Sequence, residues 1–270
     1  MNYENVSIVI PTFNREKYLK NCIESCLSQT IPCEIIVCDH GSTDNTPELM
    51  KQYEGKVTYV RRELDSGVHF CWMDGILHAK HDLIHINFDD DWMEPTFIEK
   101  CLPLFDDNTS CVISNARIVR ENNSKSDEVP FFYSKKTGKI SSGELIKKST
   151  SSLISPCAGI YRKNILIDNL FIGKIPFTKN TYHGVGPDIL FSLMSTFDFP
   201  FFGYVNEFLI NFRAHDTSIT VDAHNNPEKQ KNIHKAYQDA RIYFYLNKLI
   251  QKTNLFGIAT KILNYKQKKY

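Results

Sequence analysis

The sequence has no long apolar run and almost no excess of charge of either sign. No stretch approaches the roughly 20 apolar residues that a membrane-spanning helix needs. The 32 Lys and Arg residues nearly balance the 31 Asp and Glu residues, and the formal net charge is +1. This balance lacks the electrostatic signature of a nucleic-acid-binding protein. The first residues, MNYENVSIVIP, have no basic segment followed by a long apolar one, so we expect no signal peptide and a cytoplasmic protein.

The sequence also lacks the spacings of a zinc site. Its eight cysteines include no C-x-x-C pair and lie mostly inside apolar runs, which is typical of buried, reduced thiols. The histidines of residues 69–85 are spaced too irregularly to bind zinc together.

Strand and helix patterns alternate over the first 120 residues. Short runs rich in β-branched residues predict strands at 6–10, 34–39, 57–62, 83–88 and 111–119. Helices are predicted at 15–29, from Thr46 (as N-cap, with Pro47 in the first helical position), at 68–80 and after Pro95. This alternation predicts an α/β fold, a mostly parallel Rossmann-like sheet with helices on both faces.

The pattern is looser after residue 120. We expect a surface loop, a helix opened by a capping box of Ser141 and Glu144, a short strand at 155–162, a helix at 188–197 and a strand or hairpin at 201–215. We expect residues 1–225 to form one domain, with one half at 1–120 and the other at 121–225.

We expect residues 226–270 to form a helical extension with a distinct composition. From Ala240 to Tyr270 there are seven Lys or Arg residues and no Asp or Glu, and an apolar stripe falls on one helical face. Such a helix can lie on the anionic inner face of a membrane. Alternatively, it packs on the domain and leaves its basic side in solvent.

Three polar motifs follow predicted strands: PTFNR (11–15), CDHGSTDNT (38–46) and FDDDW (88–92). In a doubly wound sheet, ligands bind beyond the carboxyl ends of the strands. The three aspartates of FDDDW repel one another, and Mg²⁺ or Mn²⁺ bound with substrate phosphates would offset that repulsion. Acids at a helix N-terminus are the alternative, but three in a row after a buried strand exceed what capping needs.

The segments VSIVIPTFNR, EIIVCDHGSTDNT and INFDDDWMEP together resemble the inverting family 2 glycosyltransferases of the GT-A fold. The resemblance implies a nucleotide pocket formed by Pro11, Thr12, Asn14, Asp39 and Asp89. Turn chemistry is the alternative role for Thr12 and Asn14, and capping of a loop amide is the alternative for Asp39. His40 stands where the family usually has a second acid, which favours Asp39 as the base contact.

The resemblance also implies a site for Mn²⁺ or Mg²⁺. Asp90 matches the metal-ligand position, and Asp91 and His215 are the other expected metal ligands. Arg213 is expected at the diphosphate, and Arg213 and His215 have structural hydrogen bonding as their alternative. Phe88 replaces an acid often present in the family. The segment of residues 65–82 matches the family's sugar-binding segment with altered chemistry.

An inverting transfer needs a base that removes a proton from the acceptor hydroxyl. The resemblance implies that Asp188 is this catalytic base, with Pro187 in place of the usual Glu. A simple helix N-cap is the alternative role for Asp188.

The sequence therefore predicts a metal-dependent inverting glycosyltransferase. It would move a sugar from a nucleotide-diphosphate donor, expected to be UDP-linked, to a glycan or lipid-linked saccharide in cell-surface polysaccharide synthesis. One alternative is a non-catalytic protein of the same fold that binds a nucleotide sugar or a partner. The other is a sugar nucleotidylyltransferase, although PTFNR lacks the glycine-rich phosphate loop that such an enzyme needs.

Overall fold

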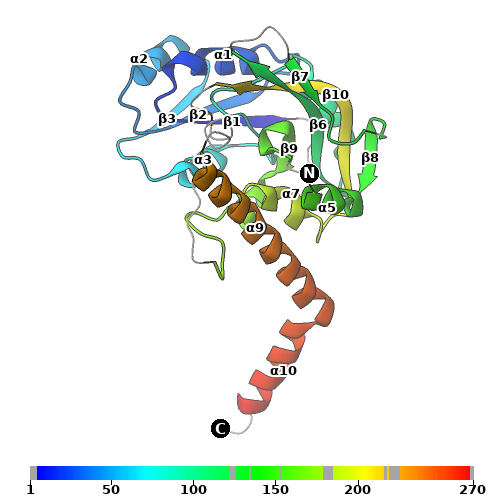
Figure 1. Ribbon diagram of the computed structural model, residues 1–270. Helices are drawn as coiled ribbons and strands as arrows, with labels where there is room; N and C mark the ends of the chain where they lie inside the picture. Colours follow the sequence, from blue (N-terminus) through cyan, green and yellow to red (C-terminus); the bar gives the residue numbers. More distant parts are fainter. Residues whose placement is uncertain are drawn as a thin grey trace.

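A mixed sheet with helices on both faces forms the body of the protein (Figure 1). The computed structural model describes residues 5–121, 126–133, 135–151, 154–178, 185–215, 218 and 226–267. Over these residues the strand order is β3-β2-β1-β4-β9-β6-β10-β5, with β7 paired to β6 and β8 paired to β10. The α/β fold predicted from the sequence is confirmed.

The first half of the sheet is parallel, as predicted. It consists of β1 (Val6–Thr12), β2 (Glu34–His40), β3 (Thr58–Arg62) and β4 (Leu83–Ile86). The predicted strand at 83–88 ends early because residues 88–91 form a turn, in which Asp91 N–H donates to the Phe88 carbonyl at 3.0 Å. This turn of residues 88–91, the acidic turn, lies at the carboxyl ends of β1 and β4.

The second half of the sheet mixes parallel and antiparallel pairs. The long strands β6 (Thr109–Arg120) and β10 (Phe201–Ala214) are parallel. Between β4 and β6 lies the antiparallel strand β9 (Gly159–Arg162). Three short strands add antiparallel edges: β5 (Trp92–Met93), β7 (Ser126–Val129) and β8 (Gly138–Ser141). Strand β9 thus separates the parallel first half of the sheet from the β6–β10 pair.

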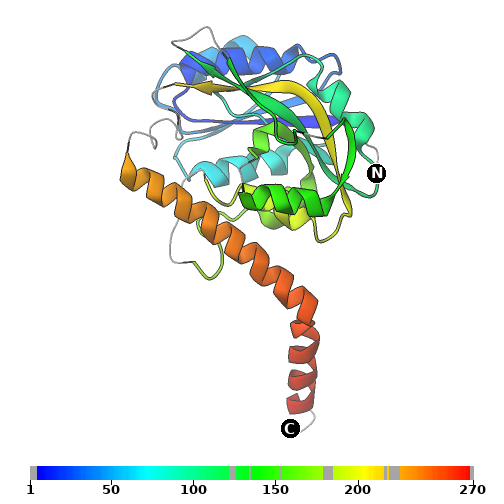
Figure 2. The ribbon, with the colours of Figure 1, turned by 45° about the vertical axis from the view of Figure 1, so that its right-hand side comes forward.

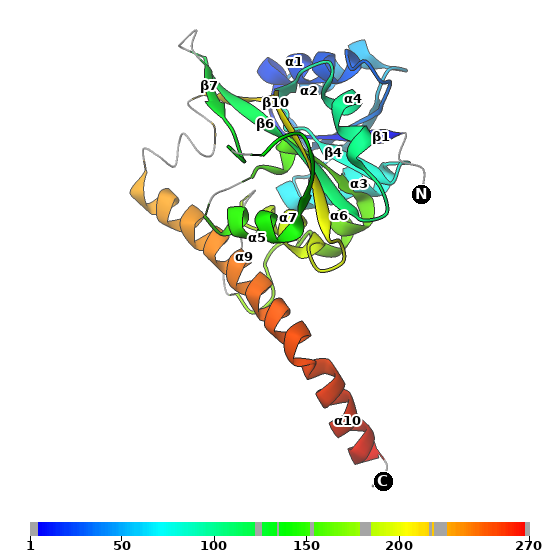
Figure 3. The same cartoon turned by 90° about the vertical axis from the view of Figure 1, so that its right-hand side faces the viewer.

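The helices form one layer on each face of the sheet (Figures 1 and 3). One layer holds α1 (Glu16–Leu27), α2 (Thr46–Met50) and α4 (Phe97–Cys101). The other holds α3 (Val68–His78), α5 (Ser142–Ser151), α6 (Lys163–Asn169) and α7 (Ile189–Ser195). Short 3₁₀ turns occur at Lys51–Tyr53 (η1), Leu102–Leu104 (η2) and Pro156–Ala158 (η3).

One predicted helix cap is wrong. Asn45, not Thr46, is the N-cap of α2, and Thr46 is the first helical residue. The reason is local, because the Asp44 carboxylate accepts the Thr46 N–H at 3.0 Å and draws that residue into the helix. Pro47 lies in the first turn, as predicted.

The apolar core lies on both sides of the sheet. The face of α1 that carries Leu19, Cys22, Ile23 and Cys26 is buried against it. All eight cysteines are free thiols; Cys33 is partly exposed, and the other seven are buried. Burial raises the pKa of the core thiols Cys38, Cys71, Cys101 and Cys111, which agrees with the buried, reduced thiols expected from the sequence.

The chain ends in two consecutive helices, α9 (Pro227–Thr253) and α10 (Leu255–Gln267). The first part of α9 packs on α7 through Ala236, Tyr237, Ala240 and Phe244. The helices then extend away from the body (Figures 1 and 2). No helix within the described ranges is long and apolar enough to cross a membrane. The division at residues 225 and 226 stays a prediction.

Candidate active site

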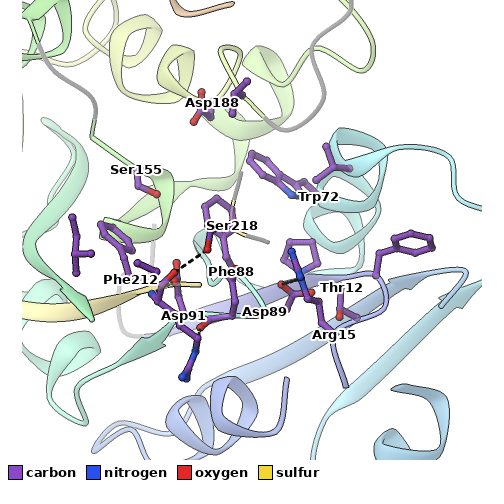
Figure 4. Close-up of a pocket in the computed structure, with 18 of the residues that line it drawn as sticks. Thr12, Arg15, Trp72, Phe88, Asp89, Asp91, Ser155, Asp188, Phe212 and Ser218 are labelled. Carbon is purple, nitrogen blue, oxygen red and sulfur yellow. Dashed lines mark hydrogen bonds and ion pairs between the residues drawn. The ribbon is translucent and has the colours of Figure 1, made fainter. Parts of the chain in front are cut away.

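A cavity of about 920 Å³ opens at the carboxyl ends of β1 and β4 (Figure 4). Its size suits a nucleotide or a sugar-sized ligand. Its wall includes residues from the strand ends, the acidic turn, α3, the end of β10, the start of α7 and α9. The polar side chains of this wall include Thr12, Arg15, His40, Asp89, Asp90, Asp91, Arg120, Asp188 and Arg213.

The buried side chain of Asn87 holds the acidic turn in place. Asn87 continues the β1–β4 pairing, since its N–H donates to the Val9 carbonyl at 2.9 Å. Its fully buried side-chain amide donates to Cys22 Sγ at 2.9 Å and to the Asp91 carbonyl at 3.3 Å. His85 contacts Asn87 Oδ1 at 3.2 Å. These bonds fix the turn, so the three carboxylates are held together at the rim of the sheet.

The three carboxylates of the turn have different environments. Burial, together with the negative charge of Asp90, raises the pKa of Asp89 to about 7, and Arg15 partly opposes this rise. Burial and the charge of Asp90 also raise the pKa of Asp91 well above its usual range. The Asp91 carboxylate accepts the Arg213 N–H at 2.9 Å. Burial and mutual repulsion thus make it costly to ionise these carboxylates together, and a bound cation would offset that cost.

His215 meets Asp90 at the end of β10. Their Nε2 and Oδ2 atoms are 3.0 Å apart, and the His215 side chain is 1% exposed. The imidazole stacks on Tyr18 with ring centroids 4.5 Å apart. The Arg213 guanidinium lies 4.7 Å from the centroid of the Trp92 ring and donates through Nε to the Asp90 carbonyl at 2.9 Å. The structure therefore brings together the predicted residues Asp90, Asp91, Arg213 and His215.

The donor set of this cluster fits a divalent cation that also binds phosphate. The described residues contain no group of three His, Cys, Asp or Glu side chains placed to enclose a metal ion. A closed protein cage is not what Mg²⁺ or Mn²⁺ requires beside a diphosphate, because one or two carboxylates plus phosphate oxygens and waters suffice. Asp90 and His215 supply such a partial set, and Asp91 is occupied by a backbone amide. The predicted roles of these residues as ligands stay predictions.

Asp188 lies across the cavity from the acidic turn (Figure 4). It is the N-cap of α7, and its side chain accepts the Ile189 N–H at 3.0 Å. The residue is 7% exposed, and this burial raises its pKa to about 6. The capping role predicted as the alternative is therefore present, and it coexists with a carboxylate that faces a ligand-sized cavity.

The predicted nucleotide residues divide into two groups. Pro11, Thr12 and Asp89 line the cavity. Asn14 and Asp39 do not belong to its lining: the Asn14 amide oxygen accepts the Thr43 N–H at 2.7 Å, and the Asp39 carboxylate accepts bonds from Ser42 and Tyr59. Their part in nucleotide binding stays a prediction. Asn14 joins the first two motifs, and Asp39 joins the second motif to β3.

His40 lines the cavity beside Asp39 and has a partner of its own. Its Nδ1 lies 2.5 Å from the Asp65 carboxylate, and its ring lies near Phe13, with centroids 5.0 Å apart. Asp65, which the sequence places in the altered sugar-binding segment, is thus tied to the second motif.

Several residues of the cavity wall were not predicted from the sequence. Trp72 lines the wall from α3, and its buried indole N–H has no hydrogen-bond partner among the described residues. Tyr237 reaches the cavity from α9. Arg15, within the first motif, lies 3.7 Å from the Asp89 carboxylate. Nothing in the sequence marks Trp72 or Tyr237, because each lies in an ordinary helical pattern and reaches the cavity only through tertiary packing.

The Rossmann-like sheet, with an acidic turn at its carboxyl edge and a carboxylate across the cavity, has the arrangement expected of the GT-A fold. The crystal structure of residues 1–349 of Staphylococcus aureus TarS in complex with UDP has a similar fold, with a TM-score of 0.64 and 17% sequence identity. The match covers 87% of this chain and 65% of that one. At this identity the likeness establishes the fold, and it confirms the GT-A expectation.

Residues 7–170 match the family model of glycosyl transferase family 2. The chain belongs to this family and is a glycosyltransferase, as predicted. It is 26% identical over 274 residues to the uncharacterized glycosyltransferase YibD of Escherichia coli K12, covering 98% of this chain and 75% of YibD. It is also 35% identical over 124 residues to a chondroitin synthase of Escherichia coli, covering 44% of this chain and 18% of the synthase. The chain thus spans only a small part of that synthase.

Proposed function

We propose that this glycosyltransferase moves one sugar from a UDP-linked donor to a hydroxyl of a glycan or lipid-linked saccharide in cell-surface polysaccharide synthesis. The observation that carries the proposal is the cavity itself. It has an acidic cluster able to hold a cation and diphosphate on one wall and the Asp188 carboxylate on the other. The TarS complex with UDP supports the choice of nucleotide, and the chondroitin synthases support the class of product.

In the proposed reaction, Asp188 accepts the proton of the acceptor hydroxyl. The acceptor oxygen then bonds to the anomeric carbon from the face opposite the diphosphate. The bond between that carbon and the diphosphate oxygen breaks, and its electron pair leaves with UDP. Attack opposite the leaving group inverts the anomeric centre, and no covalent enzyme intermediate forms.

The residues of the acidic turn have the complementary task at the donor. Asp90 and His215 would hold Mn²⁺ or Mg²⁺, which when bound stabilises the negative charge of the departing diphosphate. Arg15, Arg120 and Arg213 line the same cavity and supply positive charge near the phosphates. Thr12 lies at the end of β1, where the nucleotide is expected.

We also propose that the C-terminal helices contact an anionic membrane surface, where a lipid-linked acceptor would be present. The end of α9 and the start of α10 carry exposed apolar side chains: Ile242, Tyr245, Leu246, Leu249, Leu255, Phe256 and Ile258. Residues 240–270 carry seven basic residues and no acidic ones, which suits anionic lipids. Among the described side chains of α9, those buried against the domain lie between Ala236 and Phe244.

The experiment that tests the proposed function measures UDP release from a panel of UDP-sugars with Mn²⁺, Mg²⁺ or EDTA. Slow release that needs the metal, and that accelerates with an accepted saccharide, is the expected result. Binding of UDP-sugars without turnover under every condition would contradict it.

A further inference from the structure

Helix α9 crosses the segment before Asp188 at very close range. Gly186 has a φ of +95°, and a Cβ atom at this position would lie 2.8–2.9 Å from atoms of Ala236. Such distances are not possible for a real side chain, so only glycine allows this approach. Two residues later, Asp188 begins α7. The backbone of α9 and the start of α7 are therefore packed directly against each other.

This packing places the next residue of α9 against the Asp188 carboxylate. The Tyr237 hydroxyl donates to Asp188 Oδ2 at 3.3 Å, while Oδ1 accepts the Ile189 N–H at 3.0 Å. Tyr237 is 9% exposed and Asp188 is 7% exposed. Each carboxylate oxygen thus has a donor from a different helix, which fixes the plane of the carboxylate.

The direction of the Tyr237 bond follows from the titration of the two groups. Burial and the nearby Asp188 charge raise the pKa of Tyr237, so its phenol stays protonated and donates. Within the described ranges, Tyr161 and Arg241 also interact electrostatically with this pair. Tyr161 of β9 has a buried hydroxyl 3.4 Å from Ser192 Oγ. Arg241 of α9 donates through Nε to the Ser149 carbonyl at 3.1 Å.

We propose that Tyr237 is a positioning residue for Asp188, the proposed general base. Helix α9 would then contribute directly to the active site. The inference rests on the proposed role of Asp188. The hydroxyl aims the Asp188 carboxylate into the cavity and stabilises its ionised form. The remaining lone pairs of the carboxylate are left for the acceptor hydroxyl.

The test is Tyr237→Phe in the full chain, which keeps the ring and removes the hydroxyl. We expect kcat to fall by about 10-fold, with the donor KM unchanged, because the donor binds at the opposite wall. The acid limb of the pH–rate profile should move to higher pH, because a donor to the ionised carboxylate is lost. Tyr243→Phe is the matched control, since Tyr243 lies partly buried in the same α7–α9 packing, with its ring against Phe171.

A second variant covers the case in which the phenylalanine chain does not fold. Site-specific fluorotyrosine at position 237 keeps the shape and is a stronger donor, so it should move the acid limb to lower pH. An unmoved limb in the folded variants, or equal changes in Tyr243→Phe, would overturn the positioning role.

Asp188→Asn separates this inference from the proposed function. If Asp188→Asn stops transfer while Tyr237→Phe matches the wild-type rate and profile, the base stands and the positioning role fails. If Asp188→Asn transfers at the wild-type rate, the proposed base is wrong, and the inference fails with it.

Discussion

His215 Nε2 lies 3.0 Å from Asp90 Oδ2, although 125 residues separate the two in the chain. The pair joins the end of β10 to the acidic turn after β4, and it makes the second half of the sheet a part of the proposed donor site. The backbone of Arg213, two residues before His215, binds Asp91 in the same turn.

Asp90→Asn and His215→Gln, made singly and together, should each abolish most of the Mn²⁺-dependent stabilisation of the protein by UDP. The double variant should lose little more than either single one, because groups that bind one ion are not additive. Thermal unfolding with UDP, with and without Mn²⁺, measures this. The controls are Asp168→Asn, an exposed residue of α6, and His81→Gln, which lies outside the cavity lining. Independent, additive losses would argue against a shared ion.

The rate of transfer should fall as the pH drops through about 6. Burial raises the pKa of Asp188 to about 6, and only the ionised carboxylate can accept a proton. Asp188→Asn should cut transfer by roughly 10²-fold or more and leave UDP binding intact. The neutral side chain removes the cost of burying a charge above pH 6, so the variant should be at least as stable as the wild type at pH 8. A profile that stays flat down to pH 5 would exclude Asp188 as the base.

The family resemblance predicted which residues belong to the candidate site, but it did not give the structural role of each one. Asp90 and Asp188 could be placed because one follows a strand and the other caps a helix, and Arg213 lies near the end of the predicted strand at 201–215. Asn14 and Asp39 belong to equally recognisable motifs, yet both lie outside the cavity lining: Asn14 bonds to Thr43, and Asp39 bonds to Tyr59 of β3. A motif fixes the position of a residue in the fold, whereas the direction of its side chain depends on contacts that the sequence does not reveal.

The fold, like the site, was predictable only in part from local sequence patterns. Short runs rich in β-branched residues predicted the parallel strands β1 to β4 to within two residues at each end. The antiparallel insertion of β9 was not apparent, because four residues carry no sign of their pairing direction. Tyr237 of α9 was missed because its contact with Asp188 spans 49 residues of sequence and depends on the close approach at Gly186.

Gly75→Ala should destabilise the protein by about 1–3 kcal/mol, because it overpacks the contact between α3 and the sheet. A Cβ at Gly75 would lie 2.3 Å from Val9 Cγ1 and 2.9 Å from Cys38 Sγ, both in the buried core. Urea unfolding measures the change. The control is Gly143→Ala, where the nearest atom is Ser141 Oγ at an ordinary 3.7 Å. Equal stability of the two variants would contradict the close packing of α3 on β1.

The full chain should bind vesicles that contain phosphatidylglycerol and should not bind vesicles of phosphatidylcholine alone. Lys248→Glu with Lys252→Glu should release it, because each basic residue near an anionic surface contributes about 1 kcal/mol. Co-sedimentation measures binding. Lys20→Glu with Lys56→Glu, a reversal of equal charge at exposed sites on the body, is the control. Equal release by both pairs, or a stable dimer that ignores vesicles, would contradict membrane contact by the C-terminal helices.

The most direct test of the whole account is a crystal structure of the chain with UDP and Mn²⁺. We expect the nucleotide beyond the carboxyl ends of β1 and β4, with the ion bound to Asp90 and to the diphosphate. The Asp188 carboxylate should face the place where the sugar would be attached. A nucleotide bound elsewhere, or a diphosphate at this rim without an ion, would contradict the proposed site.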